Sequence, residues 1–238
     1  MFLGNSCVKS TLKITFLISI LVLESQLYGG AFELGMESLK AGDYAEAFCL
    51  WRPLAMQGDR EAAYHLGWLY ANGNGLRVDV RKAVYWWKRS ADAGHLDAMF
   101  DLALAYTNGE RISKDPQQAI DWYIKAAVGG HEDARDIIRM KLLKSEPLIL
   151  DRIDELVRQP WLGEPVTVSA DRVNLRSEPT TDSAVVKRLG LGQSLIMIGR
   201  QGDWCRVLEP QDSTLAWIAV WLINRQPGGS CSGIQACP

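Results

Sequence analysis

A chain of 238 residues with 26 basic and 28 acidic side chains has no charge excess. This balance excludes nucleic acid as the main partner, since phosphate binding needs a concentrated basic face. Apolar residues make up 47% of the chain and charged residues 23%, which is typical of a folded protein of one or two domains.

The N-terminal segment, residues 1–30, has the pattern of a secretory signal peptide. Lys9 and Lys13 precede an apolar run over 14–23, and small residues follow it. Ten helical residues span about 15 Å, roughly half of a bilayer core. A core helix is the weaker interpretation because nothing upstream could cover it, and an uncleaved membrane anchor is a further alternative. We therefore expect an exported protein of the periplasm or another extracytoplasmic space, which meets the membrane only through this signal.

Export would allow disulfides among the five cysteines, of which Cys7 would leave with the signal. Cys49 lies in a helical pattern and is predicted to fill the core, while Cys205 lies in a strand-like run. Cys231 and Cys237 bracket a short polar tail and could form a local disulfide. Four cysteines allow three pairings, so the connectivity stays open. No pair has zinc-finger spacing.

The middle of the chain is a repeat with a period of 36 residues. Residues 63–98 align with 99–134 without a gap, and a degenerate copy covers 31–62. Each copy is predicted to form two helices with one apolar face each. We expect Asp79 to begin a second helix and Pro116 to occupy a first helical position. Residues 135–158 are predicted to be capping helices.

The second copy combines small and aromatic residues at fixed positions, namely Leu66, Gly67, Tyr70, Gly73, Gly75, Asp79, Ala83, Trp86, Trp87, Ala91 and Gly94. With these residues the pattern resembles the Sel-one-like repeat, a relative of the tetratricopeptide repeat, over about 32–134. The third copy departs from it at Ala103 and Arg111. The resemblance implies a right-handed α-solenoid that acts as a scaffold for a protein partner.

The last third of the chain has the pattern of a small β-barrel. A linker is predicted over 159–170, and short β-branched runs separated by turn residues follow it. Among these runs lie Asn174, Arg176, Pro179, Gly192, Gly202, Asp203, Trp204, Trp217, Trp221 and Leu222. With these residues, 171–223 resembles a bacterial SH3-type domain, and 224–238 is predicted to be a tail. The resemblance implies attachment to cell-wall glycopeptide (peptidoglycan) or to a second protein. The expected fold class is therefore multidomain, an α-solenoid followed by an SH3-like β-barrel.

Aromatic side chains are the candidate binding residues in both parts. Trp204, Trp217 and Trp221 could form a binding face, although so small a barrel favours their use in the core. Tyr85 and Trp122 could line a partner groove or pack between repeats. His95 and His131 recur at equivalent positions, roughly 10 Å or more apart, which is too far to share a metal ion. Turn or cap roles are favoured for both, and no metal or cofactor is expected.

The sequence contains no catalytic signature: G-x-S-x-G, H-E-x-x-H and G-x-x-x-x-G-K are all absent. A cysteine with a histidine could form a nucleophilic pair, but the barrel that holds Cys205 contains no histidine. We expect a non-enzymatic scaffold. A wall-binding module with the solenoid as spacer and, more weakly, a cell-wall hydrolase are the alternatives.

Overall fold

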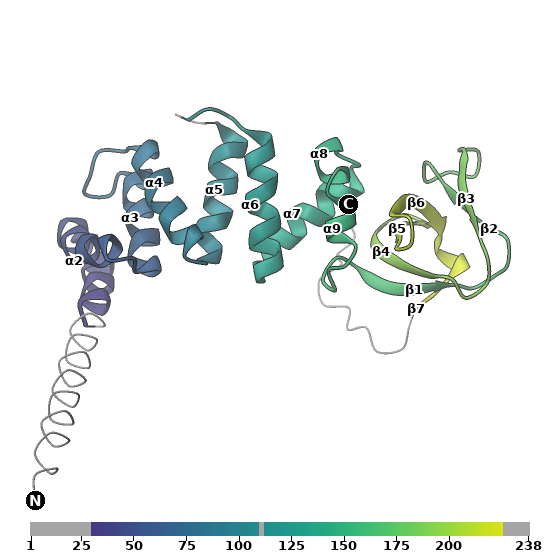
Figure 1. The fold of residues 1–238 in the computed structure, drawn as a ribbon, viewed down its shortest axis with the longest axis horizontal. Helices are drawn as coiled ribbons and strands as arrows, with labels where there is room; N and C mark the ends of the chain where they lie inside the picture. Colours follow the sequence, from purple (N-terminus) through teal and green to yellow (C-terminus); the bar gives the residue numbers. More distant parts are fainter. Residues whose placement is uncertain (1–29, 110–111, 226–238) are drawn as a thin grey trace, which may run out of the picture. The chain divides into compact units, whose positions relative to one another are not determined.

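The computed structural model describes residues 30–109 and 112–225, drawn in colour in Figure 1. The expected signal peptide and the cysteine pair Cys231 and Cys237 lie outside these residues. Within them, no helix is long and apolar enough to cross a membrane. The chain divides into two compact units, residues 1–115 and 116–238, which we call unit 1 and unit 2.

Unit 1 is built of helices that pack in consecutive order. A helix over 30–41 is followed by four helices of 13 residues each, namely α2 (Tyr44–Met56), α3 (Arg60–Asn72), α4 (Val80–Asp92) and α5 (Leu96–Asn108). The pairs α2–α3, α3–α4 and α4–α5 are in contact.

Side-chain caps fix where these helices begin. Asp59 accepts a hydrogen bond from the backbone N–H of Ala62 at 2.8 Å, and the predicted cap Asp79 accepts one from Lys82 at 3.1 Å. Gly73 ends α3 in the left-handed conformation that glycine adopts without a steric cost.

Two tryptophan rings in unit 1 each lie against the backbone of a glycine. A Cβ atom added to Gly35 would lie 2.8 Å from Cε2 of Trp51, and one added to Gly67 would lie 2.5 Å from Nε1 of Trp87. Both rings are almost fully buried. Glycine at these two positions therefore lets adjacent helices approach with an indole ring between them, because any side chain would overlap the ring.

Unit 2 begins with helices and ends with a sheet. Its helices are α6 (Pro116–Gly129), α7 (Glu132–Leu143), α8 (Pro147–Leu150) and α9 (Ile153–Leu156). Pro116 takes the first position of α6, as predicted. After α7, Ser145 adopts a left-handed φ of 54°, and its hydroxyl faces the sheet.

The sheet of unit 2 contains seven antiparallel strands. They are β1 (Glu164–Val168), β2 (Val173–Arg176), β3 (Val185–Leu189), β4 (Ser194–Gln201), β5 (Trp204–Glu209), β6 (Thr214–Ala219) and β7 (Ile223–Arg225), in the order β3-β2-β6-β5-β4-β1-β7. Strand β1 pairs with both β4 and β7. The stretch 159–170, predicted to be a linker, therefore supplies a strand of the sheet.

Both faces of strands β4 and β5 are covered. Cys205 and Val207 point into the apolar core of the sheet, whereas Leu208 is fully buried on the opposite face. There α7 contacts β4: a Cβ atom added to Gly199 would lie 2.7 Å from Cδ2 of Leu143. The helices after the repeats thus pack on the outside of the sheet, within the same compact unit.

The expected fold class is confirmed: a helical repeat region precedes a seven-stranded antiparallel β region. One prediction about a side chain is wrong. Cys49 is exposed on α2 and does not fill the core, because its position falls on the outer face of a helix whose buried residues are Ala47, Trp51, Leu54 and Ala55.

Candidate functional site

The outer side of α4 carries a stripe of cationic and aromatic residues. Lys82, Tyr85, Trp86 and Arg89 lie at helical positions i, i+3, i+4 and i+7, which share one face. Tyr85 is 54% exposed. Trp86 packs partly against the core of unit 1, and the Arg89 guanidinium lies 5.5 Å from the Trp86 ring centroid. We call these four residues together with Met56 the α4 face.

Arg89 connects the α4 face to the C-terminal end of α2 through hydrogen bonds. Its Nη1 donates to the Tyr85 hydroxyl at 3.4 Å, and its Nη2 donates to the backbone carbonyl of Met56, also at 3.4 Å. Met56 itself is 60% exposed. Both acceptors are neutral. Among the described residues, the Arg89 guanidinium therefore has no carboxylate partner, while it holds Tyr85 in place.

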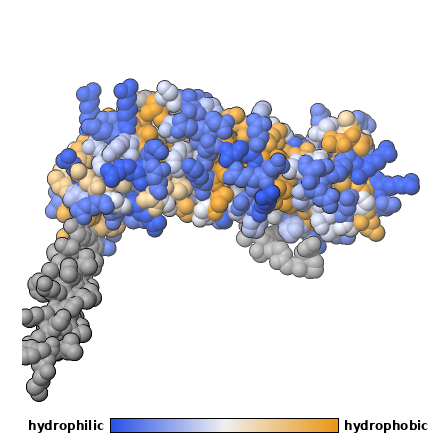
Figure 2. Space-filling view, viewed as in Figure 1, coloured by the Kyte–Doolittle hydropathy of each residue, from blue (hydrophilic) through white to orange (hydrophobic). Residues whose placement is uncertain are grey.

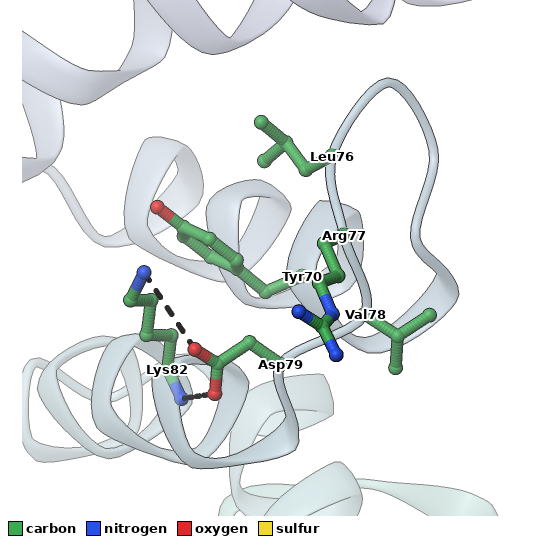
Figure 3. Close-up of a pocket in the computed structure, with 6 residues that line it drawn as sticks. All are labelled: Tyr70, Leu76, Arg77, Val78, Asp79 and Lys82. Carbon is green, nitrogen blue, oxygen red and sulfur yellow. Dashed lines mark hydrogen bonds and ion pairs between the residues drawn. The ribbon is translucent and has the colours of Figure 1, made fainter.

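A pocket opens at the N-terminal end of the α4 face, between α3, the loop after it and the start of α4. It is lined by Tyr70, Leu76, Arg77, Val78, Asp79 and Lys82, shown in Figure 3. The Lys82 ammonium lies 3.6 Å from Asp79 Oδ2 and 5.2 Å from the Tyr70 ring centroid. The pocket thus combines three apolar or aromatic side chains with three charged ones, of which the Lys82 ammonium remains largely exposed.

A second aromatic cluster lies in the interior of unit 1. The His65 ring stacks on Trp51 at 4.7 Å between centroids, and the Tyr64 ring stacks on His95 at 4.4 Å. His95 Nε2 lies 3.0 Å from a carboxylate oxygen of Glu61. Burial and the nearby carboxylates raise the pKa of the Tyr64 phenol, so Tyr64 stays neutral.

We expect unit 1 to lose stability on mild acidification through His65. Burial lowers the pKa of His65 below 6.5, although Glu61 and Asp97 oppose this shift and His95 adds to it. Below pH 6.5 the unfolded chain binds a proton that folded His65 excludes, so the free energy of unfolding falls until the lower folded-state pKa is reached. Amide hydrogen exchange of α3 between pH 7.5 and 5 measures this. The variant His65→Phe keeps a stacking ring and should flatten the profile; an unchanged slope would assign the effect to another group.

The predicted tryptophans of the sheet occupy three different environments. Trp217 is 7% exposed and stacks beneath the Arg206 guanidinium, whose carbon lies 5.1 Å from the ring centroid. Trp204 is half-buried at the start of β5. Trp221 is 63% exposed in the short 3₁₀ helix Val220–Leu222. Trp204 and Trp217 lie on the same side of β5 and β6, because Trp217 is the cross-strand partner of Arg206 and Trp204 lies two residues before it. Trp221 is the most exposed of the three rings.

The buried Arg206 was not predicted from the sequence. It is 5% exposed, its Nη2 donates to the Ser145 hydroxyl, and its Nε has no hydrogen-bond partner. Among the described residues it pairs with no carboxylate, and burial lowers its pKa. The burial of Arg206 could have been predicted from the alternation of residues in β5. Trp204 and Leu208 lie on the same side of the strand as Arg206, and two apolar residues on that side indicate a covered face.

The remaining candidates have structural positions. Trp122 is 7% exposed, with the Lys125 ammonium 3.9 Å from its ring centroid. His95 and His131 are N-caps of α5 and α7, in agreement with the cap roles predicted for them. The described residues contain no group of side chains that could hold a metal ion. Burial raises the pKa of the Cys205 thiol, which disfavours the nucleophilic thiolate.

Comparison with known families assigns the helical repeats and the sheet to two different families. The Sel1 repeat profile matches residues 60–95 and 96–131, and the bacterial SH3 domain profile matches 171–224. The chain carries Sel1 repeats and a bacterial SH3 domain. Neither profile is that of a catalytic domain. None of the curated proteins matches the chain.

Three solved structures are similar to the chain over about half of its length. A Sel1 repeat protein from Oxalobacter formigenes is 30% identical over 48% of this chain and 47% of its own, with a TM-score of 0.46. The protective antigen c5321 of uropathogenic Escherichia coli is 25% identical over 51% and 27%, with a TM-score of 0.48. The Helicobacter pylori cysteine rich protein B is 24% identical over 49% and 93%, with a TM-score of 0.40. The chain spans less than half the length of the first two.

The two Sel1 matches begin three residues before the repeat units defined above from the sequence, with the same period of 36. In this frame α3–α4 forms one repeat, so the four α4 residues of the α4 face belong to the first matched Sel1 repeat, and Met56 lies just before it. Trp221 falls inside the SH3 domain match. Each family domain therefore contributes one exposed aromatic side chain from the predicted set.

Proposed function

We propose that the protein is an exported, non-enzymatic scaffold in which the Sel1 repeats bind a protein partner and the SH3 domain binds peptidoglycan or a second protein. The proposal is carried by one observation. Each domain exposes a large aromatic side chain, Tyr85 at 54% and Trp221 at 63%. Buried aromatic side chains commonly anchor protein complexes, and a partner would cover this apolar area.

The protein-binding role of the repeats is supported by the arrangement around Tyr85. Arg89 holds the ring, so little side-chain entropy remains to be lost when a partner covers it. Met56 lies beside it and adds exposed apolar area. Arginine and tyrosine are also the residue types most often found at the energetic centre of an interface.

A photo-cross-linking experiment tests this role. A p-benzoylphenylalanine residue replaces Met56 in the α4 face and, as a control, Val128, which is 47% exposed in α6. We expect a discrete covalent adduct in intact cells from position 56 and none from position 128. Adducts from neither position would favour the second candidate, a wall-binding module in which the repeats act as a spacer.

Wall binding by the SH3 domain rests on Trp221. We expect the chain from residue 30 to 238 to sediment with purified peptidoglycan and Trp221→Ala to weaken this association at least tenfold, because the ring supplies a large exposed stacking surface. Leu191→Ala is the matched control, since Leu191 is 67% exposed on the same domain. If the wild type stays in solution, the SH3 domain is a protein-binding module. Release of soluble wall fragments would instead indicate a hydrolase.

Export is supported by the residue pattern of 1–30 alone. We expect the full-length chain to be found outside the cytoplasm with a new N-terminus close to residue 30. Mass spectrometry of the purified protein measures the mass that is removed. An intact N-terminus in a cytoplasmic fraction would contradict this part of the proposal.

A further inference from the structure

The cations of the α4 face and its surroundings exceed the carboxylates that could neutralise them. Lys88 pairs with Asp92 at 3.4 Å, and Lys82 lies 3.6 Å from Asp79. The Arg89 guanidinium instead binds only neutral acceptors. Within the described part of the chain, the exposed Arg52 on α2 and Arg77 in the pocket make no ion pair either. The surface around Tyr85 therefore has uncompensated positive charge.

This combination is confined to one copy of the repeat, so the packing of repeats does not require it. At the positions equivalent to Lys82, Tyr85 and Arg89, the preceding copy has Glu46, Cys49 and Pro53 and the following copy has Gln118, Asp121 and Lys125. The position equivalent to Met56 in the next copy is Asp92. Lys82, Tyr85 and Arg89 come together in this copy alone, with Met56 of the preceding copy beside them, which points to a ligand that binds at this one place in the repeats.

From these observations we infer that the α4 face binds a short acidic segment of a partner protein, with one apolar side chain of that segment in the pocket beside Lys82. This inference rests on the proposed protein-binding role of the repeats and adds the chemistry of the partner. Carboxylates would pair with Arg89 in the bidentate geometry that guanidinium favours, and Tyr85 and Met56 would cover the apolar side chains between them.

The length of the surface limits the length of the segment. Lys82 and Arg89 are seven residues apart, which is about 10 Å along a helix. An extended strand covers this distance with about three residues. Together with the residue that enters the pocket, about four to six residues of the partner would be recognised.

The terminal segments outside the described residues do not have this chemistry. Residues 1–29 contain Glu24 as their one acidic residue, and 226–238 contain none. Neither of these two segments is therefore the acidic segment that we infer. A peptide is favoured over an anionic membrane because, on the face of unit 1 that Figure 2 shows, hydrophobic residues lie among hydrophilic ones.

Peptide binding to the chain from residue 30 to 238 tests this inference. The probe is a pool of fluorescein-labelled hexapeptides in which acidic residues flank Leu, Phe or Tyr, and the control pool has Lys in place of the acids. Fluorescence anisotropy should show at least tenfold tighter binding of the acidic pool, weakened by salt. We expect Arg89→Glu to weaken it tenfold or more and Lys88→Glu, with the same change of charge one residue away but on another face, to change it less than twofold.

A second variant controls for the possibility that Arg89→Glu weakens binding by disturbing the fold. Tyr85→Asp places the residue of the following copy on the exposed surface and should also weaken binding at least tenfold. Equal binding of both pools, or equal losses in Arg89→Glu and Lys88→Glu, would overturn the inference. So would sedimentation with phosphatidylglycerol vesicles that Arg89→Glu abolishes, since this would assign the face to a membrane. A cross-link from position 56 without preference for acidic peptides would leave the protein-binding role intact and remove only the inference about the partner.

Discussion

The substitution Gly67→Ala is expected to lower the free energy of unfolding of the repeat region by about 2 kcal/mol. Alanine is the better helix former by about 1 kcal/mol, so an exposed helix would gain stability. Here the added Cβ would lie 2.5 Å from Nε1 of Trp87, a ring that is 8% exposed. Overpacking a rigid core typically costs 1–3 kcal/mol and sometimes more, and the short distance places this site at the upper end. Urea denaturation followed by circular dichroism at 222 nm measures the change.

The repeat itself supplies the compensating change for this prediction. The third copy has Ala103 and Tyr123 at the positions equivalent to Gly67 and Trp87. Tyrosine has a smaller ring than tryptophan, so the double variant Gly67→Ala/Trp87→Tyr should be more stable than the sum of the single changes predicts, by about 1 kcal/mol or more. Additive losses, or a Gly67→Ala variant as stable as the wild type, would show that the ring moves freely away from α3.

The second large effect is expected at Arg206, where a change to methionine should stabilise unit 2 by about 1–3 kcal/mol. The guanidinium is 5% exposed and has no carboxylate partner among the described residues, and its Nε lacks a hydrogen-bond partner. Removing a charge from water is costly, and a hydrophobic residue of similar length avoids that cost. Methionine would also keep contact with the Trp217 ring, since thioether sulfur packs well on aromatic rings.

The variant Arg206→Ala, measured in the same experiment, separates the effect of losing the charge on stability from the effect of losing side-chain volume. It removes the same guanidinium but leaves a cavity above Trp217, so we expect it to be at least 2 kcal/mol less stable than Arg206→Met. Thermal unfolding of both variants, with near-ultraviolet circular dichroism to follow the tryptophans, gives the comparison. A loss of stability in Arg206→Met would mean that the guanidinium is compensated by a bound anion or by ordered water.

The repeats were predictable from the sequence because equivalent residues recur in it at a fixed spacing. Matches at an offset of 36 fixed the helix pairs, and capping chemistry fixed their starts, as Asp79 and Pro116 show. The prediction for Cys49 failed because the faces of a helix are hard to assign in a degenerate copy of the repeat. Along a helix, each successive side chain is rotated by about 100°, so an error of one residue moves a side chain to another face. The Trp87 contact with Gly67 could not be predicted, since it depends on the distance between two helices.

The candidate site was only partly predictable. Tyr85 and Trp221 were in the predicted set, but so were Trp217 and Trp122, which are buried. The type of residue alone does not distinguish an aromatic ring that packs in a core from one that is exposed and could bind a partner. Arg89 and Met56 come together only through the contact between α4 and the end of α2, and their sequence separation of 33 residues matches no local pattern.

The packing of α7 on β4, together with strand β1, has a consequence for how the SH3 domain can be transferred between proteins. A fragment cut at residue 171, where the family match begins, would lack the strand that joins β4 to β7 and would present the bare outer side of Leu208 to water. A fragment from residue 116 keeps both. The packed sheet of this chain thus extends beyond the family match, and we expect a fragment that begins at residue 171 to be less stable than one that begins at 116.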